Sequence, residues 1–246
     1  MIVGSIKENL LLEKRVSITP ETAKNIINLG LKVIIEKNYA IHIGITDHEY
    51  EKVGVEIKSS SKEVFNNCNL LTKVNCPSDD EILNLKDKTI LIGMLNPSKN
   101  QNKINSIVKK NINVFSLELL PRISRAQSMD VLSSQSNLAG YRSVVDSIYE
   151  FEKAIPMMMT AAGTVPAAKV LIIGAGVAGL QAIATAKRLG AIVSATDVRA
   201  ASKEQVESLG GKFLTVEQSE NLETKGGYAK EVSESFKKKQ AEMMKD

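Results

Sequence analysis

Aromatic residues, cysteine and histidine are scarce in this chain of 246 residues. Tryptophan is absent, aromatic residues make up 4% of the sequence, and the net charge of +4 leaves Lys and Arg almost balanced by Asp and Glu. Because a basic surface interleaved with stacking aromatics is missing, we expect no nucleic-acid partner. The two histidines, His42 and His48, accompany no cluster of carboxylates or thiols, so the sequence predicts no metal site.

Disulfide, secretory and membrane-spanning signals are also missing. The two cysteines, Cys68 and Cys76, have a spacing typical of neither a redox pair nor a zinc pair, so we interpret them as reduced thiols. The N-terminus leads directly into charged residues without a secretory signal. Residues 170–186 carry no charge, but their glycines and the flanking Lys169 and Lys187 argue against a membrane span. We therefore expect a cytoplasmic protein with no direct membrane span.

Strand and helix patterns alternate through the first half of the chain. Short apolar runs typical of buried strands occur at residues 2–6, 31–35, 53–57, 70–74, 89–95 and 112–117. The clearest helix is predicted over residues 20–29, where Thr19 can cap, Pro20 occupies the first helical position and Gly30 ends the pattern. This alternation predicts an α/β lobe with a parallel sheet.

The most informative segment is a glycine motif that follows an apolar run. Lys169–Ile173 has the pattern of a buried strand, and residues 174–179 read Gly-Ala-Gly-Val-Ala-Gly before a helix of small residues. Gly174 would permit the tight turn, Gly176 would let backbone N–H groups approach a pyrophosphate, and Gly179 would let the helix pack closely on the strand. The segment therefore predicts a dinucleotide site, with a purely structural glycine turn as the alternative. The predicted contacts come from Gly174, Ala175, Gly176, Val177, Ala178 and Gly179.

The next apolar run ends at an acidic residue. Asp197 follows residues 191–196 and can accept hydrogen bonds from the adenosine ribose hydroxyls, which favours NAD(H) because a 2′-phosphate would meet a carboxylate. Val198 and Arg199 complete this region of the predicted site. Arg199 alone would suit NADP(H), but we interpret it as a solvated loop cation.

A polar block lies between the two halves, from Pro121 to Arg142. If a helix begins near Ser128 and runs to about residue 153, Asp130, Ser133, Ser134 and Asn137 share one face at spacings of three, four and seven. That face could line a cleft against the glycine loop. The alternative is a helix capped by Ser128 with a polar outer face.

The chain resembles a known superfamily at these motifs. The segments Glu13–Pro20, Arg122–Arg142, Gly174–Gly179, Asp197–Arg199 and Lys203–Gly210 resemble the alanine dehydrogenase and proton-translocating transhydrogenase superfamily. Within it, Arg122–Asp130 and Gly226–Glu231 are similar to the NAD(H)-binding alpha subunit, domain I, of the transhydrogenase. The resemblance implies hydride exchange between NADH bound by this chain and NADP⁺ on a partner subunit, coupled to proton translocation.

The resemblance also implies site residues and partners. Arg122, Gln127, Asp130 and Ser133 would surround the nicotinamide and its ribose, with Gln127 and Asp130 in the catalytic role. Tyr228 would belong to a mobile loop that closes over NAD(H). The implied partners are the NADP(H)-binding and membrane-spanning transhydrogenase subunits and a second copy of the chain. These partners would place it at the periphery of the inner (plasma) membrane.

Two alternatives stay open. In alanine dehydrogenase, Arg15 would match the substrate-binding arginine, but the substrate lysine falls at Asn75 and the histidine at Asn96. Asparagine supplies no ammonium charge and does not titrate near neutrality. The second alternative is a non-catalytic NAD(H)-binding interaction module.

We predict two Rossmann-like lobes with parallel sheets. An N-terminal α/β lobe covers residues 1–135, a connecting helix and linker cover residues 136–166, and the NAD(H)-binding lobe covers residues 167–246. Strand patterns at residues 170–173, 191–196 and 212–216 give this second lobe at most three strands. Since a complete dinucleotide fold has six, we expect the second lobe to be incomplete at its C-terminus.

Overall fold

The computed structural model describes residues 1–121, 123–199 and 201–215, together with residues 234, 238, 241 and 242. Two compact units divide the chain, residues 1–130 and residues 131–246. The domain boundaries that we predict at residues 135 and 166 stay a prediction. We describe each unit by itself.

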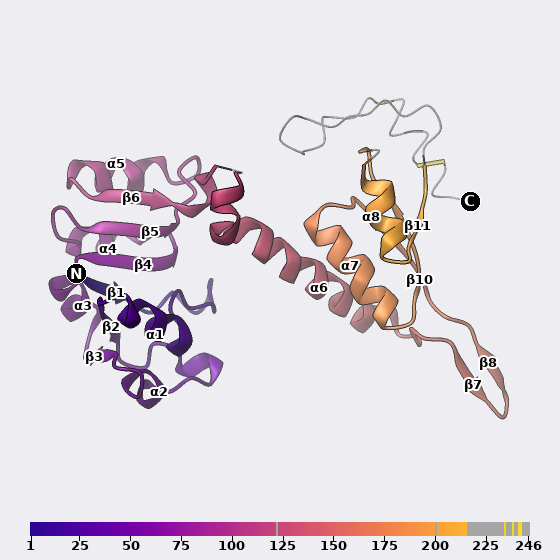
Figure 1. Ribbon diagram of the computed structural model, residues 1–246, viewed down its shortest axis with the longest axis horizontal. Coiled ribbons are helices and arrows are strands. Elements are labelled where there is room, and N and C mark those ends of the chain that lie inside the picture. Colours follow the sequence, from indigo (N-terminus) through magenta and orange to yellow (C-terminus); the bar gives the residue numbers. More distant parts are fainter. Residues whose placement is uncertain (122, 200, 216–233, 235–237, 239–240, 243–246) are drawn as a thin grey trace. The chain divides into compact units, whose positions relative to one another are not determined.

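Unit 1 contains a six-stranded parallel sheet in the order β3-β2-β1-β4-β5-β6 (Figure 1). Its strands are β1 (Ile2–Ser5), β2 (Lys32–Glu36), β3 (Glu56–Lys58), β4 (Leu70–Asn75), β5 (Ile90–Met94) and β6 (Asn113–Ser116). Its helices are α1 (Pro20–Asn28), α2 (Asp47–Glu51), α3 (Ser61–Asn67), α4 (Asp79–Asn84) and α5 (Gln101–Lys109). Three short 3₁₀ helices, η1 (Ile41–Ile43), η2 (Leu117–Leu119) and η3 (Ser124–Met129), complete the described region of the unit.

The alternation of side chains along the strands buries both faces of this sheet. In β2, Val33 and Ile35 pack with α1 and α2 residues, whereas Ile34 packs with Val64 of α3 and Ile107 of α5. A strand covered by helices on both sides reads as a continuous apolar run, as the sequence does here. The predicted α/β fold is confirmed for this unit.

In unit 1, one predicted helix start agrees with the structure and one predicted strand start does not. The capping box at Thr19 starts α1 at Pro20, as predicted. The strand predicted at residues 53–57 instead begins at Glu56, because Gly54 has φ +94° and turns the chain after α2.

Unit 2 contains a three-stranded parallel sheet in the order β11-β10-β9 within the described residues. The elements run α6 (Val131–Phe151), β7 (Met158–Thr160), β8 (Gly163–Val165), β9 (Lys169–Ile173), α7 (Val177–Arg188), β10 (Ile192–Thr196), α8 (Ser202–Ser208) and β11 (Lys212–Phe213). In the hydrophobic core of unit 2, Val144 of α6 packs with Ile183 of α7 and Val193 of β10. Within the predicted connecting segment of residues 136–166, β7 and β8 form an antiparallel hairpin, which extends away from the sheet in Figure 1.

Helix α6 packs on α7 through a glycine. A Cβ built at Gly140 would lie 2.0 Å from the carbonyl oxygen of Ala178, so only glycine permits this approach of the two helices. The helix predicted to begin near Ser128 begins at Val131, because Asp130 has ψ 83° and closes the preceding 3₁₀ turn. No helix among the described residues is long and apolar enough to span a membrane.

Candidate functional site

The glycine motif forms a tight turn between β9 and α7. Gly174 has φ +93°, in the left-handed region that favours glycine, and its N–H donates to the carbonyl oxygen of Thr196 at 2.8 Å. Gly176 has extended backbone and caps α7, which begins at Val177. The first N–H groups of a helix have no partner within the helix, so this turn presents donors and the positive end of a helix dipole to an anion.

Two glycines of the motif face different surroundings. A Cβ built at Gly179 would lie 1.8 Å from the carbonyl oxygen of Gly174, so the helix can pack against the turn only with glycine here. A Cβ built at Gly176 would meet only the Arg199 side chain, at 3.9 Å. Gly179 therefore has a packing role, whereas Gly176 leaves the surface of the turn open to a ligand.

The register of the parallel strands brings Asp197 to this turn. Ile173 of β9 pairs with Thr196 of β10, so the residues that follow both strands meet at one edge of the sheet. One carboxylate oxygen of Asp197, Oδ2, accepts a hydrogen bond from the N–H of Ala175 at 2.7 Å. The side chain of Asp197 is 5% exposed. Asp197 thus lies beside the glycine turn, and its role as an acid for the ribose stays a prediction.

Arg199 is bound to the same carboxylate. Its N–H and Nε donate to Oδ1 of Asp197 at 2.8 and 2.9 Å, and its Nη2 donates to Oδ2 at 2.9 Å. With 19% of its side chain exposed, Arg199 is not the solvated loop cation that we predicted. Burial alone would raise the pKa of Asp197, but the hydrogen bonds from Arg199 and Ala175 outweigh it and hold that pKa below its ordinary value.

The polar block is divided between the two units. Gln127 is exposed in η3, Asp130 follows η3, and Ser133 lies in the first turn of α6. Because α6 starts at Val131, the predicted helix face that included Asp130 is wrong. Ser134 donates its hydroxyl to the carbonyl oxygen of Val131 at 3.1 Å. Two predicted residues, Arg122 and Tyr228, lie outside the described residues.

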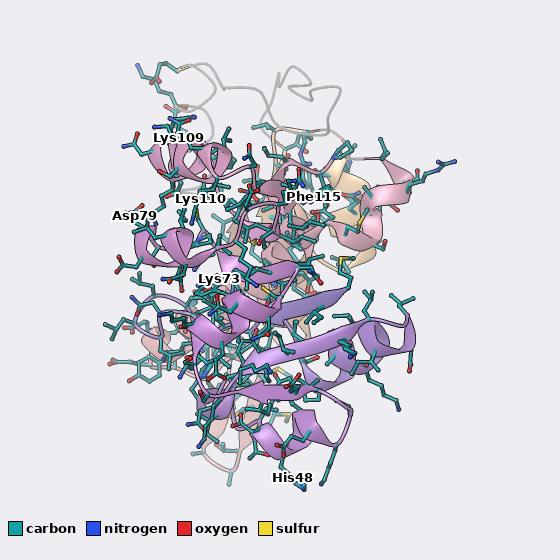
Figure 2. The ribbon with its side chains drawn as sticks, turned by 90° about the vertical axis from the view of Figure 1, so that its left-hand side faces the viewer. His48, Lys73, Asp79, Lys109, Lys110 and Phe115 are labelled. Carbon is teal, nitrogen blue, oxygen red and sulfur yellow. The ribbon has the colours of Figure 1, made fainter. Side chains whose placement is uncertain are left out.

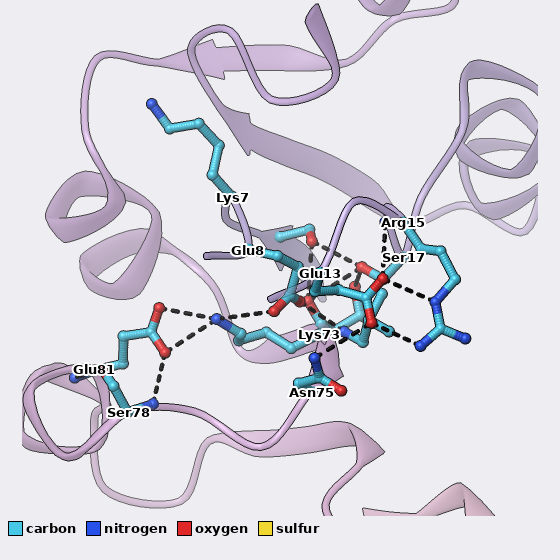
Figure 3. Close-up of polar contacts among 12 residues, drawn as sticks. Lys7, Glu8, Glu13, Arg15, Ser17, Lys73, Asn75, Ser78 and Glu81 are labelled. Carbon is cyan, nitrogen blue, oxygen red and sulfur yellow. Dashed lines mark hydrogen bonds and ion pairs between the residues drawn. The ribbon is translucent and has the colours of Figure 1, made fainter. Parts of the chain in front are cut away.

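Unit 1 holds a second polar group at the carboxyl ends of its strands (Figure 3). The Arg15 guanidinium donates to both carboxylate oxygens of Glu13, from Nε at 2.8 Å and from Nη2 at 2.6 Å. The side-chain amide of Asn75 donates to Glu13 at 3.3 Å. The hydrogen bonds from Arg15 hold the pKa of Glu13 below its ordinary value. The backbone N–H of Asn96 donates to the Glu118 carboxylate.

A buried lysine, which the sequence patterns did not predict, lies beside this group. Lys73 of β4 is 5% exposed, and its Nζ lies 2.8 Å from Glu81 Oε1 and 3.5 Å from Glu8 Oε2. Burial raises the pKa of Glu8, although Lys73 opposes this effect. In Figure 2, Lys73 lies among the strands, whereas His48 and Lys109 lie at the periphery. The available signal was a charged residue inside the strand predicted at residues 70–74, since a lysine that is buried requires carboxylate partners.

Comparison with known proteins matches both units. Residues 4–139 match the family Alanine dehydrogenase/PNT, N-terminal domain, and residues 143–243 match Alanine dehydrogenase/PNT, C-terminal domain. An NAD(P) transhydrogenase alpha subunit of Rhodospirillum rubrum is 53% identical over 98% of this chain and 65% of its own length. An alanine dehydrogenase of Methanococcus maripaludis is 30% identical over 87% of this chain and 58% of its own length.

A solved structure shows the same fold. The transhydrogenase from Sinorhizobium meliloti superposes with a TM-score of 0.84 and 49% identity, covering 88% of this chain and 64% of that one. The chain therefore spans about two thirds of the length of these transhydrogenase relatives. The resemblance inferred from the sequence motifs is confirmed, and the alanine dehydrogenase is the more distant relative.

Proposed function

Because the chain belongs to the alanine dehydrogenase/PNT family, we propose that it is the NAD(H)-binding component of a proton-translocating transhydrogenase. NADH bound by this chain gives a hydride to NADP⁺ held by a partner subunit. The identity of 53% to a transhydrogenase alpha subunit supports this choice within the family. The observation that carries the nucleotide site is the contact of Asp197 with Ala175, which joins the acid to the glycine turn.

The residues at this turn fit a dinucleotide. The N-terminus of α7 and the N–H groups beside Gly176 bind the pyrophosphate, because the surface of the turn carries no side chain at that point. Asp197 binds the adenosine ribose hydroxyls. The bound nicotinamide supplies the hydride chemistry, so the protein needs no nucleophile or metal of its own.

We propose that the polar block positions the reacting end. Arg122, Gln127, Asp130 and Ser133 bind the nicotinamide and its ribose, with Gln127 and Asp130 holding the ring in the orientation for transfer. Tyr228 covers bound NAD(H) and excludes water. Each of these roles depends on position, since the transferred hydride moves directly between two nicotinamide rings.

Partners complete this function. The relatives are named as subunits, and we propose that NADP(H)-binding and membrane-spanning subunits hold this chain at the cytoplasmic side of the inner membrane. We also propose a homodimer, which light scattering on the purified chain measures directly.

Alanine dehydrogenase is the second candidate, and the polar group in unit 1 disfavours it. Arg15 is engaged by Glu13, and asparagine occupies both positions at which that enzyme would need a lysine and a histidine. Asn75 instead donates its amide to Glu13. The two asparagines supply neither an ammonium group for a keto acid nor a side chain that titrates near neutrality.

Two assays test the proposal. The chain is mixed with the NADP(H)-binding and membrane-spanning subunits, NADH and NADP⁺, and NADPH formation is followed. In parallel, the chain alone is incubated with NADH, pyruvate and ammonium. We expect NADPH only when the partners are present and no alanine in either case. Alanine formation by the chain alone would identify the dehydrogenase, and NADH binding without hydride transfer in the complete mixture would identify a non-catalytic module.

A further inference from the structure

The contact between Arg199 and Asp197 changes what a nucleotide meets at the adenosine end of the proposed site. Three donors of Arg199 lie within 2.9 Å of the Asp197 carboxylate, and Ala175 supplies a fourth donor at 2.7 Å. A Cβ built at Gly176 would lie 3.9 Å from Nη2 of Arg199. The guanidinium therefore lies at the opening of the glycine turn, beside the acid.

Because Arg199 lies beside Asp197, repulsion between the Asp197 carboxylate and a 2′-phosphate does not by itself explain a preference for NADH over NADPH. A lone carboxylate repels a 2′-phosphate, but the positive charge of Arg199 offsets much of that repulsion at these distances. Arginine binds phosphate oxygens through two parallel N–H groups, which an aspartate partner occupies here. The same residue could therefore bind a 2′-phosphate once it is released from Asp197.

We propose that Arg199 is a latent 2′-phosphate-binding residue that Asp197 holds, so that the pair, rather than Asp197 alone, determines the choice between NADH and NADPH. This inference rests on the proposed NAD(H) site and assigns a specificity role to a second side chain within it. In the folded chain, Asp197 has two functions. It binds the ribose hydroxyls, and it engages the guanidinium and the N–H of Arg199, both of which are donors suited to an anion.

The test compares dissociation constants for NADH and NADPH, measured by isothermal titration, across single and double variants. Asp197→Ala removes both functions of the acid, Arg199→Ala removes the guanidinium, and the double variant removes the pair. Arg188→Ala is the matched control, because Arg188 is an exposed arginine of the same unit and is the last residue of α7, at the opposite end of that helix from the glycine turn. Circular dichroism and thermal melting verify that each variant is folded.

The expected results concern the ratio of the two dissociation constants. Asp197→Ala weakens NADH binding and shifts the ratio toward NADPH by at least about tenfold, the effect of one charge-assisted hydrogen bond. The double variant keeps only the part of that shift that comes from the lost ribose contact and the lost carboxylate charge, and it loses the part that the freed guanidinium adds. Arg199→Ala alone moves the ratio further toward NADH, since the carboxylate then stands without its cation. Arg199→Lys in the Asp197→Ala background retains a fraction of the gain, because an ammonium still attracts the phosphate. Arg188→Ala leaves the ratio unchanged.

Other outcomes distinguish a failure of the proposed NAD(H) site from a failure of the proposed role of Arg199. If the wild-type chain binds NADH and the ratio is equal in Asp197→Ala and the double variant, Arg199 has only a structural role and the inference is wrong. If the wild-type chain binds neither nucleotide, the proposed function fails and the inference fails with it. Should Asp197→Ala not fold, Asp197→Asn provides the same comparison, because its amide oxygen still accepts from Ala175 but carries no charge to hold Arg199.

Discussion

Replacing Gly179 or Gly176 by alanine, in two separate variants, distinguishes the packing of α7 from the binding of the nucleotide. A methyl group at Gly179 would lie 1.8 Å from the carbonyl oxygen of Gly174, about half the ordinary contact distance. The obstacle is backbone, so the turn and the helix must move apart. Overpacking of this kind costs about 1–3 kcal/mol. For a unit of this size, each kcal/mol lowers the melting temperature by roughly 4–8 °C.

Gly176→Ala provides the contrast. Its Cβ has only the flexible Arg199 side chain in reach, at 3.9 Å, and φ −76° suits alanine. The loss of a glycine helix cap costs under about 1 kcal/mol. The methyl group would nevertheless cover the surface that the pyrophosphate approaches, so NADH binding should weaken by about tenfold or more.

Thermal melting and isothermal titration with NADH measure both effects. We expect Gly179→Ala to lower the melting temperature and Gly176→Ala to lower NADH affinity with nearly unchanged melting. A Gly179→Ala protein as stable as the wild type would refute the steric argument. Full NADH affinity in Gly176→Ala would refute the placement of the pyrophosphate at this turn.

Three further predictions concern other regions of the chain. Gln127→Asn should slow hydride transfer in the reconstituted complex while NADH affinity stays nearly constant; a large loss of affinity would contradict its role in orienting the ring. Tyr39→Phe should destabilise unit 1 by about 1–3 kcal/mol in urea unfolding, because the Tyr39 hydroxyl accepts from the N–H of Ser17 at 3.0 Å; an unchanged midpoint would contradict it. Burial raises the pKa of the Cys68 thiol to about 11, so a disulfide reagent at pH 8 should modify the half-buried Cys76 first and Cys68 only on unfolding; equal rates in the native protein would contradict this order.

The sequence predicted the sheet of unit 1 well because its signals are local. The strands β1, β2 and β4 are short apolar runs with side chains in the cores on both faces of the sheet, and α1 carries its own capping box at Thr19. The start of α6 was harder to predict. Ser128 resembles a helix cap, but the 3₁₀ turn at Ser124–Met129 closes through the N–H of Asp130 and delays the helix to Val131. The start of α6 was therefore decided by competition between a possible helix cap at Ser128 and the 3₁₀ turn that contains it.

The candidate site shows the same division between local and distant signals. The glycine motif and the end of the following strand were enough to place Asp197 beside Ala175, because parallel strands end at one edge. The bond from the N–H of Arg199 to Asp197 also has a local signal, since an aspartate often accepts from the N–H two residues later. The lysine in the strand pattern indicates that Lys73 needs a carboxylate partner, but it does not identify Glu8, because only the fold brings these two residues together.

Hydride tracing in the reconstituted complex tests the central claim most directly. NADH carrying deuterium at both C4 positions is mixed with NADP⁺, this chain and its partner subunits, and the NADPH formed is analysed by mass spectrometry. We expect deuterium in NADPH when every component is present and none when this chain is omitted. NADPH without deuterium, or no NADPH from a mixture in which the chain binds NADH, would contradict it.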